Sequence, residues 1–334
     1  MTFKSNTGRK AVHAVLFVGI ASAAALGTAS ADPLKTWRHG VIEPKSDAGF
    51  ILMAAKGEFA EKQGLKIETV PLKSDALAIK ALLAGELDSY EGGPGTAIAA
   101  ASHGADVKVI GCAWPQPVHG IFVRSDIKDA KDLKGKRFAI SAPGAFPDLL
   151  ARATLEKGGV SPSDVQLANL GGDLDRYKAL AAGVVDAAVV STEYLPLADK
   201  NIKMLYTARE VMPDFIRTCT MTSGKVLSTK HDEAVHFIAA EISAMRYAVA
   251  NKDKTVALTK EETQAKADDP RAAFLFDEVV KHGDLDPEMK IPTDKLDWLQ
   301  NLMVKTGNLT KPADISKMVD QNVRTEAEKI VGGK

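Results

Sequence analysis

Residues 80–96 read KALLAGELDSYEGGPGT, and this stretch decides the fold class. An alanine- and leucine-rich helix stops at Gly85, because glycine adopts the left-handed conformation that ends helices without steric cost. Residues 87–90 then predict a short strand, and the loop after it, rich in glycine, leads into another helix from Thr96. Helix, strand and helix in such close succession are typical of α/β folds.

The same alternation of strand and helix extends to both sides of this stretch. Strands are predicted at residues 35–41, 65–70, 87–90, 107–112, 118–123, 137–141, 165–170, 186–191 and 202–206, and helices at 49–61, 75–83 (capped by Asp75), 96–102, 146–156 and 174–182. This order predicts parallel sheets with helices on both faces. After about residue 228, amphipathic helices are predicted at 232–251, 253–267, 270–282 and 293–305, with few strand signals.

An internal echo supports two similar lobes. Residues 80–88 (KALLAGELD) are matched by residues 178–186 (KALAAGVVD). Each segment is a helix end, a glycine stop and a strand entered through an aspartate. Coincidence between alanine-rich helices is the alternative, but the shared glycine and aspartate positions favour a duplicated unit.

Composition bounds the size and the partners. The chain has 334 residues, of which 45% are hydrophobic, and this is enough for two domains with their own cores. Lys plus Arg equals Asp plus Glu, at 43 each, and basic residues do not cluster, so we expect no nucleic-acid partner. The chain has no G-x-S-x-G, Walker, H-E-x-x-H or paired C-x-x-C motif. We therefore expect a binding protein without cofactor or metal, and not an enzyme.

A targeting signal precedes the predicted fold. Basic residues occur within the first ten positions, residues 11–26 form an uncharged and mostly apolar run, and residues 29–31 (ASA) form an A-x-A cleavage site. A membrane anchor is the alternative, but it needs about 20 apolar residues, more than this run provides. We expect a signal peptide of residues 1–31, cleaved after Ala31, and export to the periplasm.

The chain contains two cysteines, Cys112 and Cys219. Export makes a disulfide between them chemically possible. Two buried free thiols, which pack as small apolar groups, are the alternative. Because the sequence does not give the separation of the two Cα atoms, both interpretations stay open.

Three loops follow predicted strands and precede predicted helices. They are residues 42–49 (IEPKSDAG), 91–96 (EGGPGT) and 141–146 (SAPGAF). Ligands of open α/β sheets bind outside the carboxyl ends of the strands, and helix starts offer free N–H groups. The loops could be tight turns only. If they face one another from two lobes they form a binding cleft, and Gly93 and Gly144 should then share one hollow.

Three further side chains are candidates for ligand specificity. Trp114 could stack on a flat ligand, or it could be a core or hinge aromatic. His119 either faces the cleft or packs behind it. Glu193 follows the last strong strand of the second lobe, so it too is expected at the cleft. The carboxylates of Glu43, Glu91 and Glu193 favour a donor or a cation, whereas helix ends favour anions, so the charge of the ligand stays open.

Several of these segments carry a family resemblance. The segments are residues 52–59 (LMAAKGEF) with 64–68 (GLKIE), residues 84–88 (AGELD) with 103–109 (HGADVKV), and residues 132–137 (DLKGKR) with the loop 141–146. Together they resemble the nitrate/sulfonate/taurine-binding proteins of ABC transporters, the SsuA/THI5-like (NMT1-like) group. The resemblance covers roughly residues 37–221, and the C-terminal helices fit only in style.

The resemblance implies a type II periplasmic-binding-protein fold, with two α/β lobes joined by two crossover strands and extra C-terminal helices. Lobe 1 would comprise residues 32–118 plus 221–334, and lobe 2 residues 119–220. Both cysteines would flank the crossovers and could lie near one another. The ligand-binding positions that the resemblance implies are Glu43, Ser46, Gly93, Gly95, Thr96, Ala145 and Phe146.

The implied function is capture of a small molecule by lobe closure, followed by delivery to an ABC permease and ATPase complex at the inner membrane. We expect a monomer. An organic anion, such as a sulfonate or a carboxylate, is the first expectation for the ligand, and a neutral heterocycle of the pyrimidine or thiamine-precursor type is the second. An exported enzyme on the same fold and a sensor partner of a membrane kinase are the alternatives. The pyrimidine synthases of the group use a cysteine-rich metal segment that this chain lacks.

Overall fold

The structure, a computed structural model, describes residues 1–2, 33–42 and 44–332. Apart from its first two residues, the predicted signal peptide lies outside the described residues, as do its cleavage site and Glu43. The folded unit begins at Leu34. Within the described part of the chain, no helix is long and apolar enough to span a membrane.

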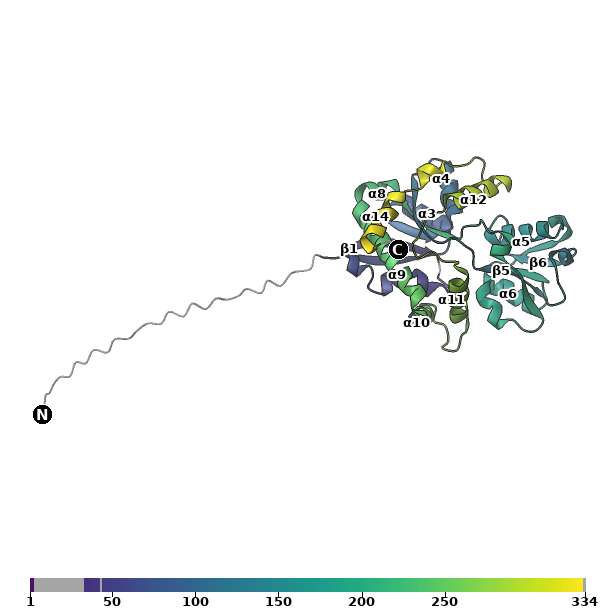
Figure 1. The fold of residues 1–334 in the computed structure, drawn as a ribbon, viewed down its shortest axis with the longest axis horizontal. Helices are drawn as coiled ribbons and strands as arrows, with labels where there is room; N and C mark the ends of the chain where they lie inside the picture. The colour runs from purple at the N-terminus through teal and green to yellow at the C-terminus, as the bar shows by residue number, and fades with distance from the viewer. Residues whose placement is uncertain (3–32, 43, 333–334) are drawn as a thin grey trace. The chain divides into compact units, whose positions relative to one another are not determined.

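Two five-stranded sheets organise the folded unit, and their strand orders correspond (Figure 1). The order is β2-β1-β3-β10-β4 in the first sheet and β7-β6-β8-β5-β9 in the second. In each sheet the first three strands are parallel, and the fourth runs antiparallel to both of its neighbours. The strands are β1 (Lys35–Ile42), β2 (Leu65–Leu72), β3 (Ser89–Gly92), β4 (Val107–Trp114), β5 (His119–Arg124), β6 (Arg137–Ile140), β7 (Gln166–Asn169), β8 (Ala187–Ser191), β9 (Ile202–Thr207) and β10 (Thr218–Ser223).

Helices connect and cover these strands. The α-helices are α1 (Ala48–Ile51), α2 (Met53–Lys56), α3 (Asp75–Ala84), α4 (Pro94–Ser102), α5 (Phe146–Lys157), α6 (Asp173–Ala181), α7 (Ala208–Val211), α8 (Gly224–Thr229), α9 (His231–Ala250), α10 (Lys252–Glu262), α11 (Arg271–His282), α12 (Thr293–Lys305), α13 (Ile315–Met318) and α14 (Gln321–Val331). Short 3-10 turns are η1 (Glu61–Gln63), η2 (Ala130–Leu133), η3 (Pro162–Asp164) and η4 (Thr192–Leu197).

The antiparallel strands β5 and β10 correct the expectation of fully parallel sheets. The chain leaves the first sheet after β4, enters the second through β5, and returns from β9 by way of α7 into β10. β5 and β10 are therefore the strands through which the chain arrives from the other sheet. A strand that arrives this way does not belong to a βαβ unit, so the crossover that keeps consecutive strands parallel does not constrain its direction.

The segment repeated in the sequence folds in the same way twice. Gly85 and Gly183 both adopt positive φ, at 78° and 70°, and stop the preceding helix. The carboxylate of Asp88 then accepts a hydrogen bond from the backbone N–H of Arg38 at 2.8 Å, and that of Asp186 accepts one from Arg137 at 2.9 Å. In both cases the same aspartate also pairs with the guanidinium of that arginine. The repeat therefore marks corresponding positions in the two sheets.

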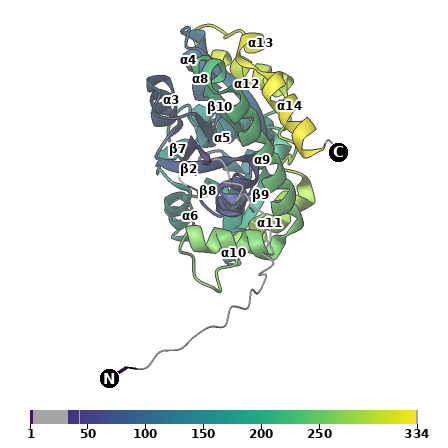
Figure 2. The same ribbon diagram turned by 90° about the vertical axis from the view of Figure 1, so that its left-hand side faces the viewer.

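Helices cover both faces of the first sheet. Ile79 and Leu82 of α3 and Ile98 of α4 belong to one buried cluster with strand residues of β4 and β10. On the other face, Phe237 of α9 stacks on Trp37 of β1 at 5.2 Å between ring centroids. Figure 2 shows α14 beside α9, which it contacts. The C-terminal helices thus complete the core of the first sheet.

Side chains of the second sheet alternate between its two faces. Along β6, Phe138 and Ile140 join the cluster that contains α5 residues, whereas Ala139 joins the cluster that contains α6 residues. Val189 and Val190 of β8 divide in the same way. A period of two residues is the expected pattern of a strand with helices on both faces. The helices α5 and α6 are labelled beside this sheet in Figure 1.

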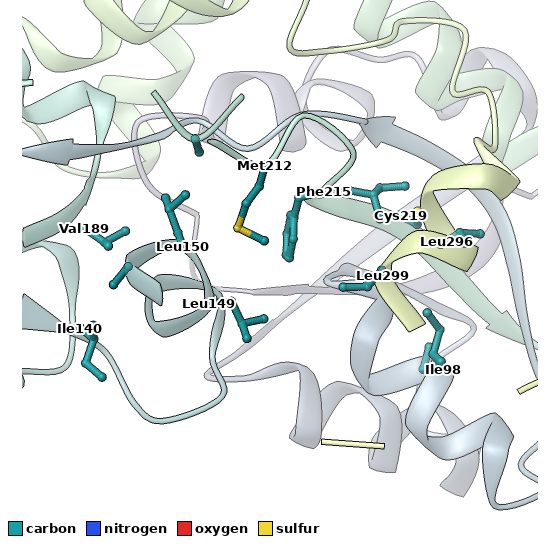
Figure 3. Close-up of a cluster of buried hydrophobic side chains, with 14 of the residues drawn as sticks. Ile98, Ile140, Leu149, Leu150, Val189, Met212, Phe215, Cys219, Leu296 and Leu299 are labelled. Carbon is teal, nitrogen blue, oxygen red and sulfur yellow. The ribbon is translucent and has the colours of Figure 1, made fainter. Parts of the chain in front are cut away.

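One hydrophobic cluster continues from the second sheet to the first. Figure 3 shows Met212 and Phe215, from the segment between α7 and β10, with Leu149 and Val189 to one side and Leu299 to the other. All of these side chains belong to the same cluster. The segment that leads back to the first sheet is therefore packed into the core rather than being a loose linker.

The structure settles the state of the two cysteines. Cys112 of β4 and Cys219 of β10 form a disulfide, with an S–S distance of 2.04 Å. β4 and β10 are adjacent antiparallel strands of the first sheet. The alternative of two free thiols is therefore wrong.

Two local predictions were wrong as well. Ser74, not Asp75, caps α3, because its side chain accepts from the N–H of Leu77, and Asp75 is the first residue of the helix. The helix predicted at 49–61 consists of α1, α2 and η1, since the chain departs from helical geometry at Leu52 and at Gly57.

At Gly49, the N–H donates to Thr259 Oγ1 of α10 at 2.8 Å, and an added Cβ would lie 2.0 Å from the carbonyl oxygen of Thr255. Only glycine allows this close approach.

Candidate ligand-binding site

Three neighbouring cavities are each lined by residues from the segments that flank the first sheet and from those that flank the second. The polar chamber has a volume of about 280 Å³, the apolar chamber about 410 Å³ and the side pocket about 560 Å³. The polar chamber is lined by Val41, Ile42, Lys45, Asp47, Ile51, Asp75, Glu91, Gly92, Gly93, Pro117, His119, Phe146, Phe215, Arg217 and Thr218. The apolar chamber is lined by Asp75, Gly93, Pro94, Gly95, Thr96, Ala99, Gly144, Ala145, Phe146, Leu149, Phe215, Ile216, Leu299, Met303 and Asn308.

Arg217, immediately before β10, is a cation in the wall of the polar chamber. Its guanidinium pairs with Asp47 and lies over the ring of Trp114 at 4.5 Å. Burial is the largest influence on Asp47 and raises its pKa, but the charge and hydrogen bond of Arg217, together with those of Lys45, outweigh burial and hold this pKa below its usual value. The Nη1 atom of Arg217 is buried and, among the described residues, has no hydrogen-bond partner. A ligand in the chamber could satisfy this donor.

Asp173, at the start of α6, gathers the other charges. Lys45 Nζ lies 2.8 Å from its carboxylate, and Arg176 Nη2 lies 2.6 Å from it. His119 Nε2 is 3.6 Å away. Burial opposes ionisation of Asp173, yet these neighbours hold its pKa well below the usual value. Since Lys45 follows β1, its ion pair joins an element of the first sheet to one of the second.

His119, at the start of β5, is a neutral side chain of the polar chamber. Burial lowers its pKa to about 4, although Asp173 acts in the opposite direction. Its Nδ1 atom is buried and has no partner among the described residues. Its ring meets Phe146 edge-on at 5.1 Å, and Phe146 lies 4.4 Å from Phe215 between ring centroids. The rings of His119 and Phe146, from the side of the second sheet, and of Phe215, from the segment that returns to the first, thus line the chamber.

Glu91 and Asp75 are the carboxyl groups of the polar chamber that form no ion pair among the described residues. Burial raises the pKa of Glu91 to about 7, even though Thr218 donates a hydrogen bond to it at 3.0 Å. Burial also raises the pKa of Asp75, whose Oδ1 accepts from the N–H of Gly93 at 2.8 Å. Asp75 reaches this N–H because Gly92 has no side chain, and an added Cβ would lie 2.1 Å from its Oδ1.

The site residues predicted from the sequence are divided among the three cavities. His119 lines the polar chamber, Gly95, Thr96 and Ala145 line the apolar chamber, and Gly93 and Phe146 line both. Ser46 and Glu193 line the side pocket, where burial raises the pKa of Glu193 to about 7. Glu43 lies outside the described residues. Gly93 and Gly144 do share one hollow, the apolar chamber.

Trp114 corrects one prediction. Its side chain is fully buried, where Phe50 meets it edge-on at 5.7 Å, and it does not line any of the three cavities. Arg217 lies over the Trp114 ring and also lines the polar chamber. The guanidinium of Arg217 therefore separates this ring from the interior of the chamber. Direct stacking of Trp114 on a ligand is therefore not supported, and the interpretation as a core aromatic is right.

Sequence reasoning missed the charged centre of the polar chamber. Lys45 and Asp47 lie in the quoted loop 42–49, but nothing in their pattern separated them from ordinary surface residues. Arg217 immediately precedes a crossover strand, and this position could have identified it as a candidate site residue. For Leu299 and Met303 of α12, the sequence held no signal of a place in the apolar chamber. Only the tertiary structure brings α12 against α4, next to this chamber. Among the described residues, no cluster of His, Cys, Asp and Glu could hold a metal ion.

Known proteins share this architecture. A protein of Bacillus subtilis named for binding aliphatic sulfonates is 28% identical over 264 residues, which cover 74% of this chain and 78% of that protein. The periplasmic aliphatic sulphonate binding protein SsuA from Escherichia coli superposes with a TM-score of 0.72 at 20% identity, over 86% of this chain and 92% of that one. The desulfurization enzyme DszB superposes with a TM-score of 0.67 at 15% identity, over 89% and 99%.

These similarities show a fold and a family. The two sheets form the periplasmic-binding-protein fold, as the sequence predicted, and DszB shows that the same fold can carry an enzyme. The model of the NMT1/THI5-like family matches residues 45–255, well over half of the chain. The protein belongs to the NMT1/THI5-like family.

Proposed function

We propose that this chain is an exported solute-binding protein of an ABC importer. It captures a small organic solute in the polar chamber, between a lobe of residues 32–118 plus 221–334 and a lobe of residues 119–220, as a monomer in the periplasm. The observation that carries the proposal is the lining of this chamber, in which β1, β3 and β10 of the first sheet face His119 and Phe146 of the second. A ligand held by both sides favours the closed arrangement.

Closure supplies the signal that an importer needs. Lys45 and Asp173 meet only when the loop after β1 lies against the start of α6. A permease that recognises this closed surface distinguishes the loaded from the empty protein. Family membership and the relatives named as binding proteins support this role over catalysis.

The charges of the polar chamber favour a solute that donates hydrogen bonds. Both cations of the wall, Lys45 and Arg217, are already paired with carboxylates. Glu91 and Asp75 have raised pKa values and no paired cation among the described residues, so they can accept from, or when protonated donate to, a ligand. A neutral nitrogen heterocycle, with donors toward Glu91, acceptors toward Arg217 Nη1 and its ring against Phe146, fits this lining best.

An organic acid is the second candidate. The unpartnered Nη1 of Arg217 favours it, as does the relative named for binding aliphatic sulfonates. An acid in this chamber would lie near Glu91 and Asp75, which would then have to be protonated. The affinity for an acid should therefore increase as the pH falls below about 7.

The first experiment identifies the ligand that the protein itself selects. Protein purified without refolding is denatured, and the supernatant is analysed by mass spectrometry. A thermal-shift screen of nitrogen heterocycles, sulfonates and carboxylates then ranks candidates, because a ligand at about 100 times its Kd adds about 2.7 kcal/mol of stability. Product formed during incubation with a stabilising ligand would instead support an enzyme.

Two substitutions separate the candidate ligand classes. Glu91→Gln should weaken a donor-bearing heterocycle by about tenfold, because a charge-assisted acceptor is lost. Asp47→Asn frees the guanidinium of Arg217 and should tighten an acid without tightening the heterocycle. Glu86→Gln, at an exposed position, is the control and should change neither affinity. If no ligand responds to any change in the polar chamber, solute capture there is wrong.

A further inference from the structure

The apolar chamber adjoins the polar chamber, and the two cavities share four lining residues. These are Asp75, Gly93, Phe146 and Phe215. The Phe146 and Phe215 rings, 4.4 Å apart between centroids, therefore stand at the boundary between the chambers. A solute held in the polar chamber has additional space of about 410 Å³ on the other side of this boundary.

The walls of the apolar chamber differ from those of its neighbour. Figure 3 shows Leu149 of α5 to one side, Leu299 of α12 to the other and Phe215 between them. Met303 of α12 also lines this chamber. Among the described residues, Asp75 at the shared boundary is the one ionisable residue of its lining. Most of the surface of this chamber is apolar, so it favours apolar groups of a ligand.

Two lining residues of this chamber, Gly144 and Asn308, approach each other closely from the two sides. Gly144 adopts a φ of 76°, and an added Cβ there would lie 2.7 Å from Asn308 Oδ1. The loop before α5 and the segment after α12 therefore approach each other closely. Side chains of both segments therefore limit the space inside the chamber, which is where the length of an apolar group could be sensed.

We propose that the apolar chamber accepts an apolar extension of the solute whose polar part occupies the polar chamber, and that Leu299 and Met303 set the length that fits. This inference rests on the proposed function. Each additional methylene that is buried tightens binding about fourfold until the end of the chamber is reached. α12 lies beyond the residues 45–255 that the family model matches, so this part of the specificity comes from the C-terminal helices.

The test varies the tail and the head of the probe separately. Three series, n-alkanesulfonates, 5-alkyluracils and n-alkylamines with one to eight carbon atoms in the alkyl chain, are titrated into the mature protein by calorimetry. In the series whose head group binds, affinity should rise about fourfold per methylene and then level off or fall.

Substitutions at one position should move that limit in both directions. Met303→Trp fills the chamber and should weaken the longest binding members by at least tenfold while leaving the methyl member within about twofold. Met303→Ala enlarges it and should move the optimum to longer chains. Val304→Trp is the matched control, because Val304 is the exposed next residue of the same helix and does not line the chamber. It should leave the whole series unchanged.

The outcomes distinguish the two proposals. If one series binds but its affinity does not depend on chain length, or if Met303→Trp weakens short and long members equally, the apolar subsite is wrong and solute capture stands. If no member of any series binds and the purified protein carries no small molecule, the proposed function fails and this inference fails with it.

Discussion

At the scale of single residues, Glu91 decides the chemistry of the polar chamber. It is the residue before Gly92, which ends β3, and it accepts a hydrogen bond from Thr218 and forms no ion pair among the described residues. Burial raises its pKa to about 7, with Asp47 acting in the same direction and Arg217 against it. Near neutral pH, Glu91 therefore exists in both protonation states and can donate as well as accept.

Glu91→Gln should change how stability depends on pH. The pKa of Glu91 is higher in the folded state, about 7, than in the unfolded chain, about 4.5, so the folded state binds more protons between these values. The free energy of unfolding of the wild type therefore falls as pH rises from about 4.5 to 7, by up to roughly 3 kcal/mol from this group. The variant lacks this decrease. The free energy of unfolding of the variant minus that of the wild type, measured by urea unfolding, should therefore be larger at pH 8 than at pH 5.

Glu86→Gln provides the control for this experiment. Glu86 is exposed and lies five residues before Glu91 in the same stretch of chain. Its unfolding curves should follow those of the wild type at both pH values. Equal differences between Glu91→Gln and the wild type at pH 5 and pH 8 would contradict the assigned environment of Glu91.

Gly92→Ala tests how tightly β3 is built against Asp75. The added methyl would lie 2.1 Å from Asp75 Oδ1 and would displace the carboxylate from the N–H of Gly93. We expect a loss of about 2–3 kcal/mol in the free energy of unfolding, from overpacking and the lost hydrogen bond. Gly93→Ala, whose Cβ would find its nearest neighbour at 3.7 Å, should cost about 1 kcal/mol or less. Similar losses in both variants would show that the contact with Asp75 is unimportant.

At the scale of elements, the loop after β1 and the start of α6 form the charged contact between the two sheets. Lys45 Nζ lies 2.8 Å from Asp173, which Arg176 and the N–H of Ser191 also hold in place. Asp173 is buried and fixed, whereas Lys45 is half exposed. The lysine is therefore the partner that can leave when the lobes open, and the aspartate stays in its own lobe.

Lys45→Met should weaken closure without damaging the fold. A partly exposed ion pair contributes up to about 1 kcal/mol, so the bound solute should dissociate up to about fivefold faster in stopped-flow fluorescence. Lys56→Met is the matched control, because Lys56 pairs with Glu262 at the same 2.8 Å between two helices, α2 and α10, that both pack around the first sheet. An equal increase in the dissociation rate for both variants would remove Lys45 from the closing contact.

At the scale of the whole molecule, the disulfide closes the neck of the second lobe. Cys112 and Cys219 are 107 residues apart, and the enclosed chain contains all strands of the second sheet, β5 to β9. A cross-link over a loop of this length restricts the unfolded chain strongly. It also fixes β4 to β10, the strands through which the chain leaves and re-enters the first sheet.

Replacing both cysteines by alanine should lower the free energy of unfolding by about 3–5 kcal/mol. The measurement is urea unfolding of the wild type and the double variant, each with and without dithiothreitol. Reductant should lower the free energy of unfolding of the wild type to about that of the double variant. It should leave the free energy of unfolding of the variant unchanged. A wild type that is insensitive to reductant even when unfolded would show that the thiols are not paired in the protein as isolated.

The sequence by itself determined the local pattern of this protein. The glycine stops at Gly85 and Gly183, the strands that follow them and the amphipathic C-terminal helices could all be read from residue types, because helix ends and periodicities are local properties of the chain. The repeat predicted two corresponding units, and the quoted loops did contain residues of the cavities.

Only the tertiary structure decided which side chains share a cavity and which charges are paired. Arg217 meets Asp47 across 170 positions of sequence, Cys219 meets Cys112 through the strand that returns from the other sheet, and Met303 joins Gly95 in one wall. Such contacts, like the raised pKa of Glu91, depend on distances and burial that no local pattern encodes. The direction of β10 was missed for the same reason, and the sequence left open whether Trp114 is a core residue or contacts a ligand.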